Sequence, residues 1–475
     1  MPVPSFPRSA ALLLPLALLC GCASHQQYRD RYSVCSNATA ELSADCARHA
    51  IQRLPLQQGG GYLLGFVEFD DQGHLWDRRQ MMELVDLLNA ESASRDLLLV
   101  VFVHGWKHSA APGDGNIETF RKVLARLGAD EAELGRAAGR PPRQVAGVYL
   151  GWRGGSVPVP VLENLTFWDR KNTAEKVGSG DMIEVLARLE QIKRDKASFT
   201  PDSSTRLVVV GHSFGGLVVH AALGQTLSGR FVRTAGLPRP RDDGKAERDA
   251  VRDGLSTNVE GFGDLVVLIN PAFEAQRFAS LSDMSTERGS YFTAQLPVVA
   301  VLTSEADYAT RYAFPAGRAL STLFEQTRDS TRRNATTAQL ESIAESEANV
   351  QAVGHFEPYR THWLRPRPGV ARSAVAQQRS DQDMGVALAA ARGWQDDAPG
   401  SRIAFSDVVL ERSATSAGRN PYLVVRVDGD LIQDHNDIDD ERVVQFLKEL
   451  VLISTVPQRE KELLYRSFGL PPGRP

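Results

Sequence analysis

The sequence lacks the signatures of several common protein classes. Its four cysteines among 475 residues do not form zinc-type pairs, and it has neither a glycine-rich phosphate-binding loop nor an internal repeat. Its formal net charge of −4 provides no basic field that would attract nucleic acid. We therefore predict no metal site, no cofactor and no nucleic-acid partner. Hydrophobic residues at 42% and charged residues at 24% are typical of a globular protein with a substantial core.

The N-terminus carries a short apolar run of the kind found in export signals. Arg8 precedes the run from Ala10 to Leu19, which is shorter than the roughly 20 residues that a membrane-spanning helix needs. The tetrad Leu19-Cys20-Gly21-Cys22 resembles the bacterial lipobox, whose last cysteine is acylated. The resemblance implies a signal peptide over residues 1–21 and a lipid anchor on Cys22. The protein would then lie in the bacterial cell envelope, at the outer membrane or the periplasmic face. The alternative is an ordinary secretory signal cleaved nearby.

Two cysteines remain once Cys20 and Cys22 are assigned to the signal and the anchor. An exported compartment permits a disulfide between Cys35 and Cys46, and closing so short a loop contributes on the order of 3 kcal/mol. The alternative is a pair of buried free thiols. We predict the disulfide.

The remaining chain reads as one large α/β domain. We expect a tether and N-terminal segment over residues 22–58, the domain over residues 59–455 and a C-terminal tail over residues 456–475. Short apolar or alternating runs predict strands at Gly61–Phe69, Leu97–Val103, Gln144–Leu150, Leu207–Val210, Leu265–Ile269, Val298–Leu302 and Tyr422–Val427. Helical spacing falls between or after them at Arg78–Leu88, Ile117–Leu127, Met182–Ile192, Leu217–Leu227 and Val443–Leu450. This alternation favours a doubly wound, mostly parallel sheet.

Three stretches interrupt the alternation of strands and helices. They cover residues 153–180, 229–262 and 326–419, and they are rich in glycine, proline, arginine or aspartate. Loops of this length are usually functional lids or mobile segments, so we interpret them as insertions in the domain. The third can contain a helix of its own around Ala338–Ala348.

One motif carries a candidate nucleophile. Gly211-His212-Ser213-Phe214-Gly215 follows an apolar strand directly and leads into an apolar helical stretch. A tight strand-to-helix turn exposes the serine. Such a turn needs small residues two positions before and two positions after the serine. The amide groups and the dipole at the start of the helix stabilise negative charge beside the hydroxyl. The alternative is a glycine-rich turn with a bystander serine.

In this motif the chain resembles the α/β-hydrolase superfamily, over roughly Gly61 to Leu452. The segment His104-Gly105-Trp106 directly follows a buried strand and resembles the family's His-Gly element, whose loop supplies an oxyanion-binding amide. By that match the backbone N–H groups of Trp106 and Phe214 are the expected oxyanion donors. Gly105 would let the backbone approach the substrate closely, and His104 would brace the loop. We interpret His212 as a packing residue.

The resemblance also implies an acid and a base in the chain order Ser, acid, His. Asp307 follows the expected strand Val298–Leu302 at the family's usual offset. The alternatives are Glu305, Glu274, or none of the three, in which case each carboxylate is only a surface charge. His435 follows the strand Tyr422–Val427 and precedes a terminal helix, as the family's base does. The other candidates for the base are His355 and His362, which precede it in the long third insertion.

Together these residues imply a serine hydrolase of the esterase or lipase type. Ser213, Asp307 and His435 would form a catalytic triad that cleaves carboxylic esters through an acyl-enzyme. The substrate would be a small-molecule or lipid ester, and the protein would be attached to the membrane through its lipid anchor. The alternatives are an acyltransferase or lipase acting on lipids, a peptidase or thioesterase, and a non-catalytic hydrolase-like lipoprotein that binds a cell-envelope partner.

Overall fold

The computed structural model describes residues 25–36, 43–55, 61–155, 166–234, 258–292, 295–322, 324–369, 380–438 and 440–455. The expected signal peptide, Cys22 and the tail over 456–475 lie outside these residues, as do parts of all three insertions. Among the described helices, none is both long enough and apolar enough to cross a membrane.

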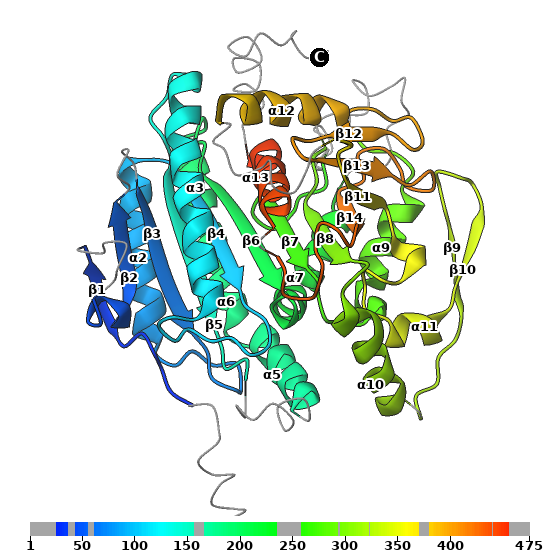
Figure 1. The fold of residues 1–475 in the computed structure, drawn as a ribbon, viewed down its shortest axis with the longest axis horizontal. Coiled ribbons are helices and arrows are strands. Elements are labelled where there is room, and N and C mark those ends of the chain that lie inside the picture. Colours follow the sequence, from blue (N-terminus) through cyan, green and yellow to red (C-terminus); the bar gives the residue numbers. More distant parts are fainter. Residues whose placement is uncertain are drawn as a thin grey trace, which may run out of the picture.

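A single large sheet organises the chain (Figure 1). Its twelve strands run in the order β1-β2-β3-β5-β4-β6-β7-β8-β14-β11-β13-β12. The pairs from β3 through β11 are all parallel, whereas β2 is antiparallel to β3, and β13 is antiparallel to both β11 and β12. The strands are β1 Arg31–Cys35, β2 His49–Pro55, β3 Gly61–Glu68, β4 Leu97–Val103, β5 Gln144–Gly151, β6 Arg206–His212, β7 Leu265–Ile269, β8 Val299–Ser304, β11 His362–Pro366, β12 Arg402–Ala404, β13 Val408–Arg412 and β14 Tyr422–Val427.

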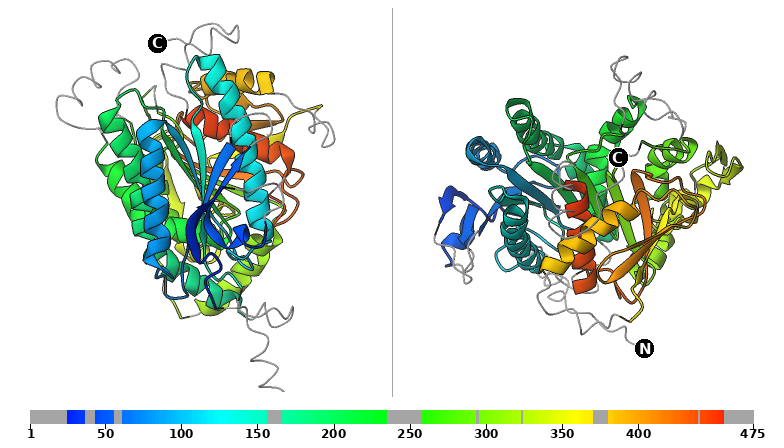
Figure 2. Two further views of the ribbon diagram at one scale, coloured as in Figure 1. Left: turned by 90° about the vertical axis from the view of Figure 1, so that its left-hand side faces the viewer. Right: turned by 90° about the horizontal axis from the view of Figure 1, so that it is seen from above.

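Helices cover both faces of this sheet (Figure 2). Apolar side chains of α2, α5, α6, α7 and α9 join the core on one face, and those of α3, α12 and α13 join the cores on the other. Neighbouring residues of β4 alternate between the two cores, which is why its sequence is apolar throughout. The helices are α2 Arg78–Ser94, α3 Gly115–Ala138, α5 Phe167–Ser179, α6 Met182–Phe199, α7 Phe214–Val232, α9 Ala279–Glu287, α10 Phe314–Ser321, α11 Glu345–Val350, α12 Ser380–Gly393 and α13 Glu441–Thr455.

The third insertion differs from its interpretation as a loop or lid. Within residues 326–419, three segments form β11, β13 and β12 and extend the sheet beyond β14. The insertion contains helices of its own, as expected, but the one placed around Ala338–Ala348 starts only at Glu345 (α11). Leu340–Ile343 is instead strand β10, paired with β9 (Ser330–Arg333). The Asn334 side chain accepts the amides of Thr336 and Thr337, and this turn favours a hairpin over a helix.

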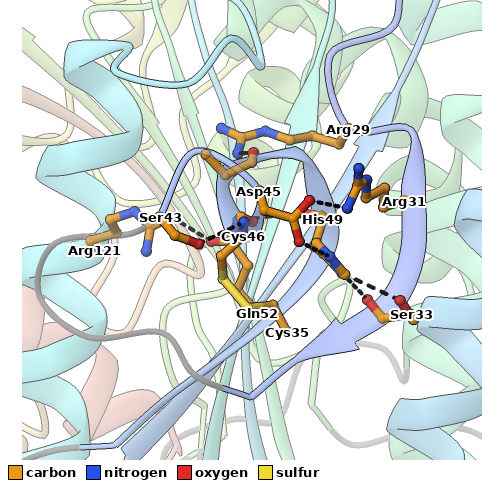
Figure 3. The surroundings of a disulfide bond; sticks show 11 residues. Arg29, Arg31, Ser33, Cys35, Ser43, Asp45, Cys46, His49, Gln52 and Arg121 are labelled. Atoms are coloured by element: carbon orange, nitrogen blue, oxygen red, sulfur yellow. Dashed lines mark hydrogen bonds and ion pairs between the residues drawn. A yellow bond between two sulfur atoms is a disulfide. The ribbon is translucent and has the colours of Figure 1, made fainter.

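The N-terminal segment also joins the sheet. Instead of a simple tether, the structure places β1 and β2 at its edge. The predicted disulfide is present and joins Cys35, at the end of β1, to Cys46 at the start of the short 3-10 turn η1 (Cys46–Arg48) (Figure 3). It therefore ties the first strand to the turn that leads into the second.

Candidate active site

The sheet brings the predicted functional residues to one edge. Ser213 follows β6, Gly105 follows β4, Asp307 follows β8 and His435 follows β14. These strands are parallel, so their carboxyl ends lie at the same edge of the sheet, where ligands of such folds bind.

Ser213 occupies a strained turn between β6 and α7. Its backbone has φ 55° and ψ −121°, a region that a residue with a side chain rarely adopts. Its amide donates to the Ile269 carbonyl at 2.9 Å, which fixes the turn to β7. A Cβ atom on Gly215 would overlap the Val103 carbonyl, and one on Gly211 would lie 2.6 Å from the Gly215 carbonyl. The small residues of the motif are therefore required by the packing of this turn.

Ser213, His435 and Asp307 form a continuous hydrogen-bond chain. The Asp307 Oδ2 atom lies 2.8 Å from His435 Nδ1, and the Ser213 Oγ atom lies 2.6 Å from His435 Nε2. A carboxylate can only accept, so Nδ1 carries the proton and Nε2 is free to accept the proton of the serine hydroxyl. Asp307 is completely buried. Burial opposes its ionisation, yet hydrogen bonds from His435 and Thr310 hold the pKa of the Asp307 carboxyl below its usual value.

Two residues that the sequence did not assign to the site extend this chain behind Asp307. The Thr310 amide donates to Asp307 Oδ1 at 3.1 Å, and the Thr310 hydroxyl donates to Oδ2. Because that hydroxyl donates to the carboxylate, its oxygen accepts from His355 Nε2 at 3.0 Å. Burial lowers the pKa of His355 to about 4, so its ring is neutral. His355, considered above as an alternative base, thus supports the acid instead.

If the triad cleaves esters, as the sequence leads us to expect, replacing Thr310 with valine should lower kcat about tenfold, because the Asp307 carboxylate loses one net hydrogen bond. KM should stay within twofold, since Thr310 is buried behind the carboxylate. Steady-state kinetics of Thr310→Val beside Thr310→Ser checks this, because serine keeps the hydroxyl. A serine variant as impaired as the valine variant would contradict the role of that hydrogen bond.

The loop after β4 lies against Ser213. A Cβ atom on Gly105 would come within 2.7 Å of the Ser213 Cβ atom, so only glycine allows this close approach. The Phe214 amide is the first of α7, and the first amides of a helix have no intrahelical acceptor. Among the described residues no backbone acceptor lies opposite the Trp106 amide. Both predicted oxyanion donors are therefore available beside Ser213.

His104 braces this loop, as expected. Its Nδ1 atom donates to the Gly105 carbonyl at 2.9 Å, and its Nε2 atom accepts the Trp152 amide at 3.0 Å. The Trp152 indole donates in turn to the His104 carbonyl, and the two rings stack. Burial lowers the pKa of His104 to about 4, which keeps the ring neutral and its tautomer fixed.

His212 does more than pack, and it acts together with Asn270. The His212 Nε2 atom and the Asn270 side-chain amide each donate to the backbone carbonyl of His435 at 3.0 Å. Asn270 also accepts the Ser304 amide at 3.0 Å. It follows β7 and has a positive φ of 43°, which asparagine tolerates better than most residues. These contacts connect His435 to the ends of three neighbouring strands, β6, β7 and β8.

The alternative acids lie in other surroundings. Glu274 is buried in an ion-pair cluster with Lys171, Arg277 and Arg318 at 2.8–2.9 Å. Glu305 is exposed, and its carboxylate accepts the Gly429 amide at 3.4 Å. Neither glutamate has a contact with His435 in the described residues.

His362, the last of the candidate bases, makes its contacts away from the triad. It starts β11 and is fully buried, where it stacks on Trp394 and bonds to Thr361. Among the described residues no group of three potential metal ligands occurs.

An aromatic cluster packs next to the turn that carries Ser213. The Phe167 ring, at the start of α5, contacts the ring of Phe214 at 4.8 Å and that of Trp106 at 5.2 Å between centroids. Trp168 continues the cluster to Phe314 of α10. The cluster therefore places apolar surface at both residues whose amides are the candidate oxyanion donors, which would favour an apolar group in any ligand bound there.

The buried neutral histidines predict that the free energy of unfolding decreases as the pH falls. Burial lowers the pKa of five of them to about 3 or 4, from about 6.5 in the unfolded chain: His104, His212, His220, His355 and His362. The unfolded chain therefore binds more protons between these values. Each group should cost up to about 1.4 kcal/mol per pH unit as pH falls through this window.

Denaturant titrations from about pH 7 to about pH 5 would measure this slope. His220 offers a matched variant because it stacks on Phe273 and donates to the Arg277 carbonyl, away from the triad. His220→Asn should have a shallower pH dependence. A slope equal to that of the parent protein would contradict the assignment.

Comparisons of the chain with protein-family models, curated proteins and solved structures find no match. Its function must accordingly be inferred from the site.

Proposed function

We propose that this chain is a serine hydrolase of the α/β-hydrolase type that cleaves carboxylic esters. The observation that carries the proposal is the hydrogen-bond chain from Ser213 through His435 to buried Asp307. The strained serine turn, the His-Gly loop beside it and the parallel sheet support the same interpretation.

The geometry supports a two-step acyl transfer. His435 Nε2 takes the hydroxyl proton while Ser213 Oγ attacks the ester carbonyl carbon, and the carbonyl oxygen becomes an oxyanion facing the Trp106 and Phe214 amides. His435 then gives that proton to the leaving alcohol as the carbon–oxygen bond breaks. Water repeats the sequence on the acyl-enzyme, and it returns the Ser213 hydroxyl and releases the acid. Asp307 holds the imidazole tautomer and stabilises the imidazolium throughout.

We also propose that the protein is a lipoprotein of the bacterial cell envelope. The support is the lipobox-like Leu19-Cys20-Gly21-Cys22 after its apolar run, and the disulfide, which fits an oxidising compartment. Metabolic labelling with a fatty acid that carries an alkyne should mark the wild-type protein and leave Cys22→Ser unmarked.

A fluorophosphonate probe tests the enzymatic proposal directly. It should modify the protein with a one-to-one stoichiometry, and peptide mass spectrometry should place the adduct on Ser213. His435→Ala should react far more slowly, because the hydroxyl loses its base. A folded wild-type protein that stays unmodified would reject the proposal and would favour the non-catalytic binding module.

A further inference from the structure

The described chain begins at the same edge of the sheet as the nucleophile. The His25 ring packs on Trp76 at 4.8 Å, and the Tyr28 amide donates at 2.8 Å to Glu68, the last residue of β3. Because β3 is parallel to the strands that lead to the triad, its carboxyl end belongs to the active-site edge. This edge is the lower one in Figure 1, where α5 and α10 lie.

The candidate lipid anchor is therefore tethered close to this edge. Cys22 precedes His25 by only three residues in the sequence. Three residues of fully extended chain span about 10 Å. A diacylated Cys22 would consequently hold the bilayer surface near the carboxyl ends of the strands, whatever path those residues take.

Exposed aromatic side chains follow the catalytic acid at this edge. Tyr308 directly precedes the π-helical turn η3 (Ala309–Ala313), and Tyr312 lies within it; they are 70% and 53% exposed, and their rings lie 5.3 Å apart. Phe324, just beyond α10, is 95% exposed. Large aromatic rings exposed together mark an interaction surface, and tyrosine prefers the membrane–water interface.

The turn η3 has a buried side that faces the triad and an exposed side that carries aromatic rings, as a membrane-facing surface requires. Thr310 points inward and holds the Asp307 carboxylate, whereas its neighbours carry the exposed rings. Arg311 lies with its guanidinium 5.4 Å from the Tyr312 ring centre and is exposed as well. An arginine beside interfacial tyrosines complements the phosphate groups of lipids.

We propose that the active-site edge lies against the membrane that anchors Cys22, with Tyr308, Tyr312 and Phe324 in the lipid interface. The ester substrates then come from lipids of that same bilayer, a consequence that rests on the proposed function. The orientation itself rests on the anchor and the exposed rings.

The opposite edge of the sheet offers a matched control. Phe199 is 87% exposed at the end of α6, just before the residues that lead into β6. Ser203 and Ser204 in that connection bond to Asp96, which directly precedes β4. Phe199 therefore lies at the amino ends of the strands and should face away from the membrane.

Site-specific fluorescence tests the orientation without any catalysis. The acylated full chain carrying Tyr312→Cys or Phe199→Cys is labelled with a nitrobenzoxadiazole dye. It is then placed in phosphatidylethanolamine–phosphatidylglycerol vesicles that contain a nitroxide-labelled lipid. The dye at position 312 should shift its emission to the blue and be quenched, and the dye at position 199 should remain unchanged. Equal quenching at both positions, or quenching at 199 alone, would overturn the proposal.

Hydrolysis assays separate the orientation from the chemistry. The double variant Tyr312→Ser/Phe324→Ser should cleave a water-soluble ester normally but a vesicle-borne ester about tenfold more slowly, as expected for a loss of about 1.4 kcal/mol of interfacial binding. Quenching at position 312 with no hydrolysis of either ester would reject the proposed function and keep the orientation. Hydrolysis of the soluble ester without quenching at 312 would reject the orientation alone.

Discussion

Replacing Ser213 with alanine is expected to lower kcat for a short nitrophenyl ester by about five to six orders of magnitude. In the proposed mechanism the Ser213 oxygen forms the bond to the acyl group. The variant lacks this oxygen, which lies 2.6 Å from His435 Nε2 in the parent protein. The two candidate oxyanion amides remain, so a small residual rate above the reaction in water should persist. Purified variant and parent would be compared by steady-state kinetics at matched concentrations.

Ser228→Ala provides a control on the same helix. Its hydroxyl donates only to the Gly224 carbonyl, one turn back along α7, so activity should remain within twofold. Both variants should unfold at denaturant concentrations close to the parent value. If Ser213→Ala kept more than a few per cent of the parent activity, another residue would have to be the nucleophile.

The second large effect concerns the acid. Asp307→Asn should lower kcat about 10⁴-fold while the protein stays folded. The Oδ2 atom accepts from both His435 Nδ1 and the Thr310 hydroxyl, and an amide NH₂ at that position can accept neither bond. An amide oxygen there still accepts but no longer carries the charge that stabilises the imidazolium. Either orientation of the asparagine therefore weakens the base.

The two rejected glutamates give controls with different expected signatures. Glu305→Gln alters an exposed carboxylate and should change neither activity nor stability. Glu274→Gln should reduce stability, because it leaves Lys171 and Arg318 without their buried counter-charge, while kcat of the folded fraction stays close to normal. A loss of kcat in Glu274→Gln that matched that of Asp307→Asn would show that the acid is wrongly assigned.

The central strands could be predicted because their physical requirement is simple. Leu97–Val103, Leu265–Ile269 and Tyr422–Val427 are apolar nearly throughout, as strands buried on both faces must be, and the structure has them with the predicted bounds. The outer strands carry no such pattern. β11 contains arginine and proline, and β12 has only three residues, so they depend on pairing with their neighbours.

The same distinction applies to the site. Ser213, Asp307 and His435 could be chosen because each follows a recognisable strand, and the parallel sheet then brings them together. The partners around them have no such marker in the sequence. His355 reaches the acid from 48 positions further along the chain through Thr310, and Asn270 reaches the base from β7. Contacts of this kind are created by the tertiary structure alone.

The hydrogen bonds from His212 and Asn270 to the His435 carbonyl limit how the sequence of this region can change among related chains. The main chain at His435 is held by the ends of β6 and β7, and Leu431 and Ile432 bury the connection from β14 in the core. The connection is therefore fixed at both of its ends. Related chains should keep Asn270 and the number of residues between β14 and His435, while the exposed side chains in between are free to vary.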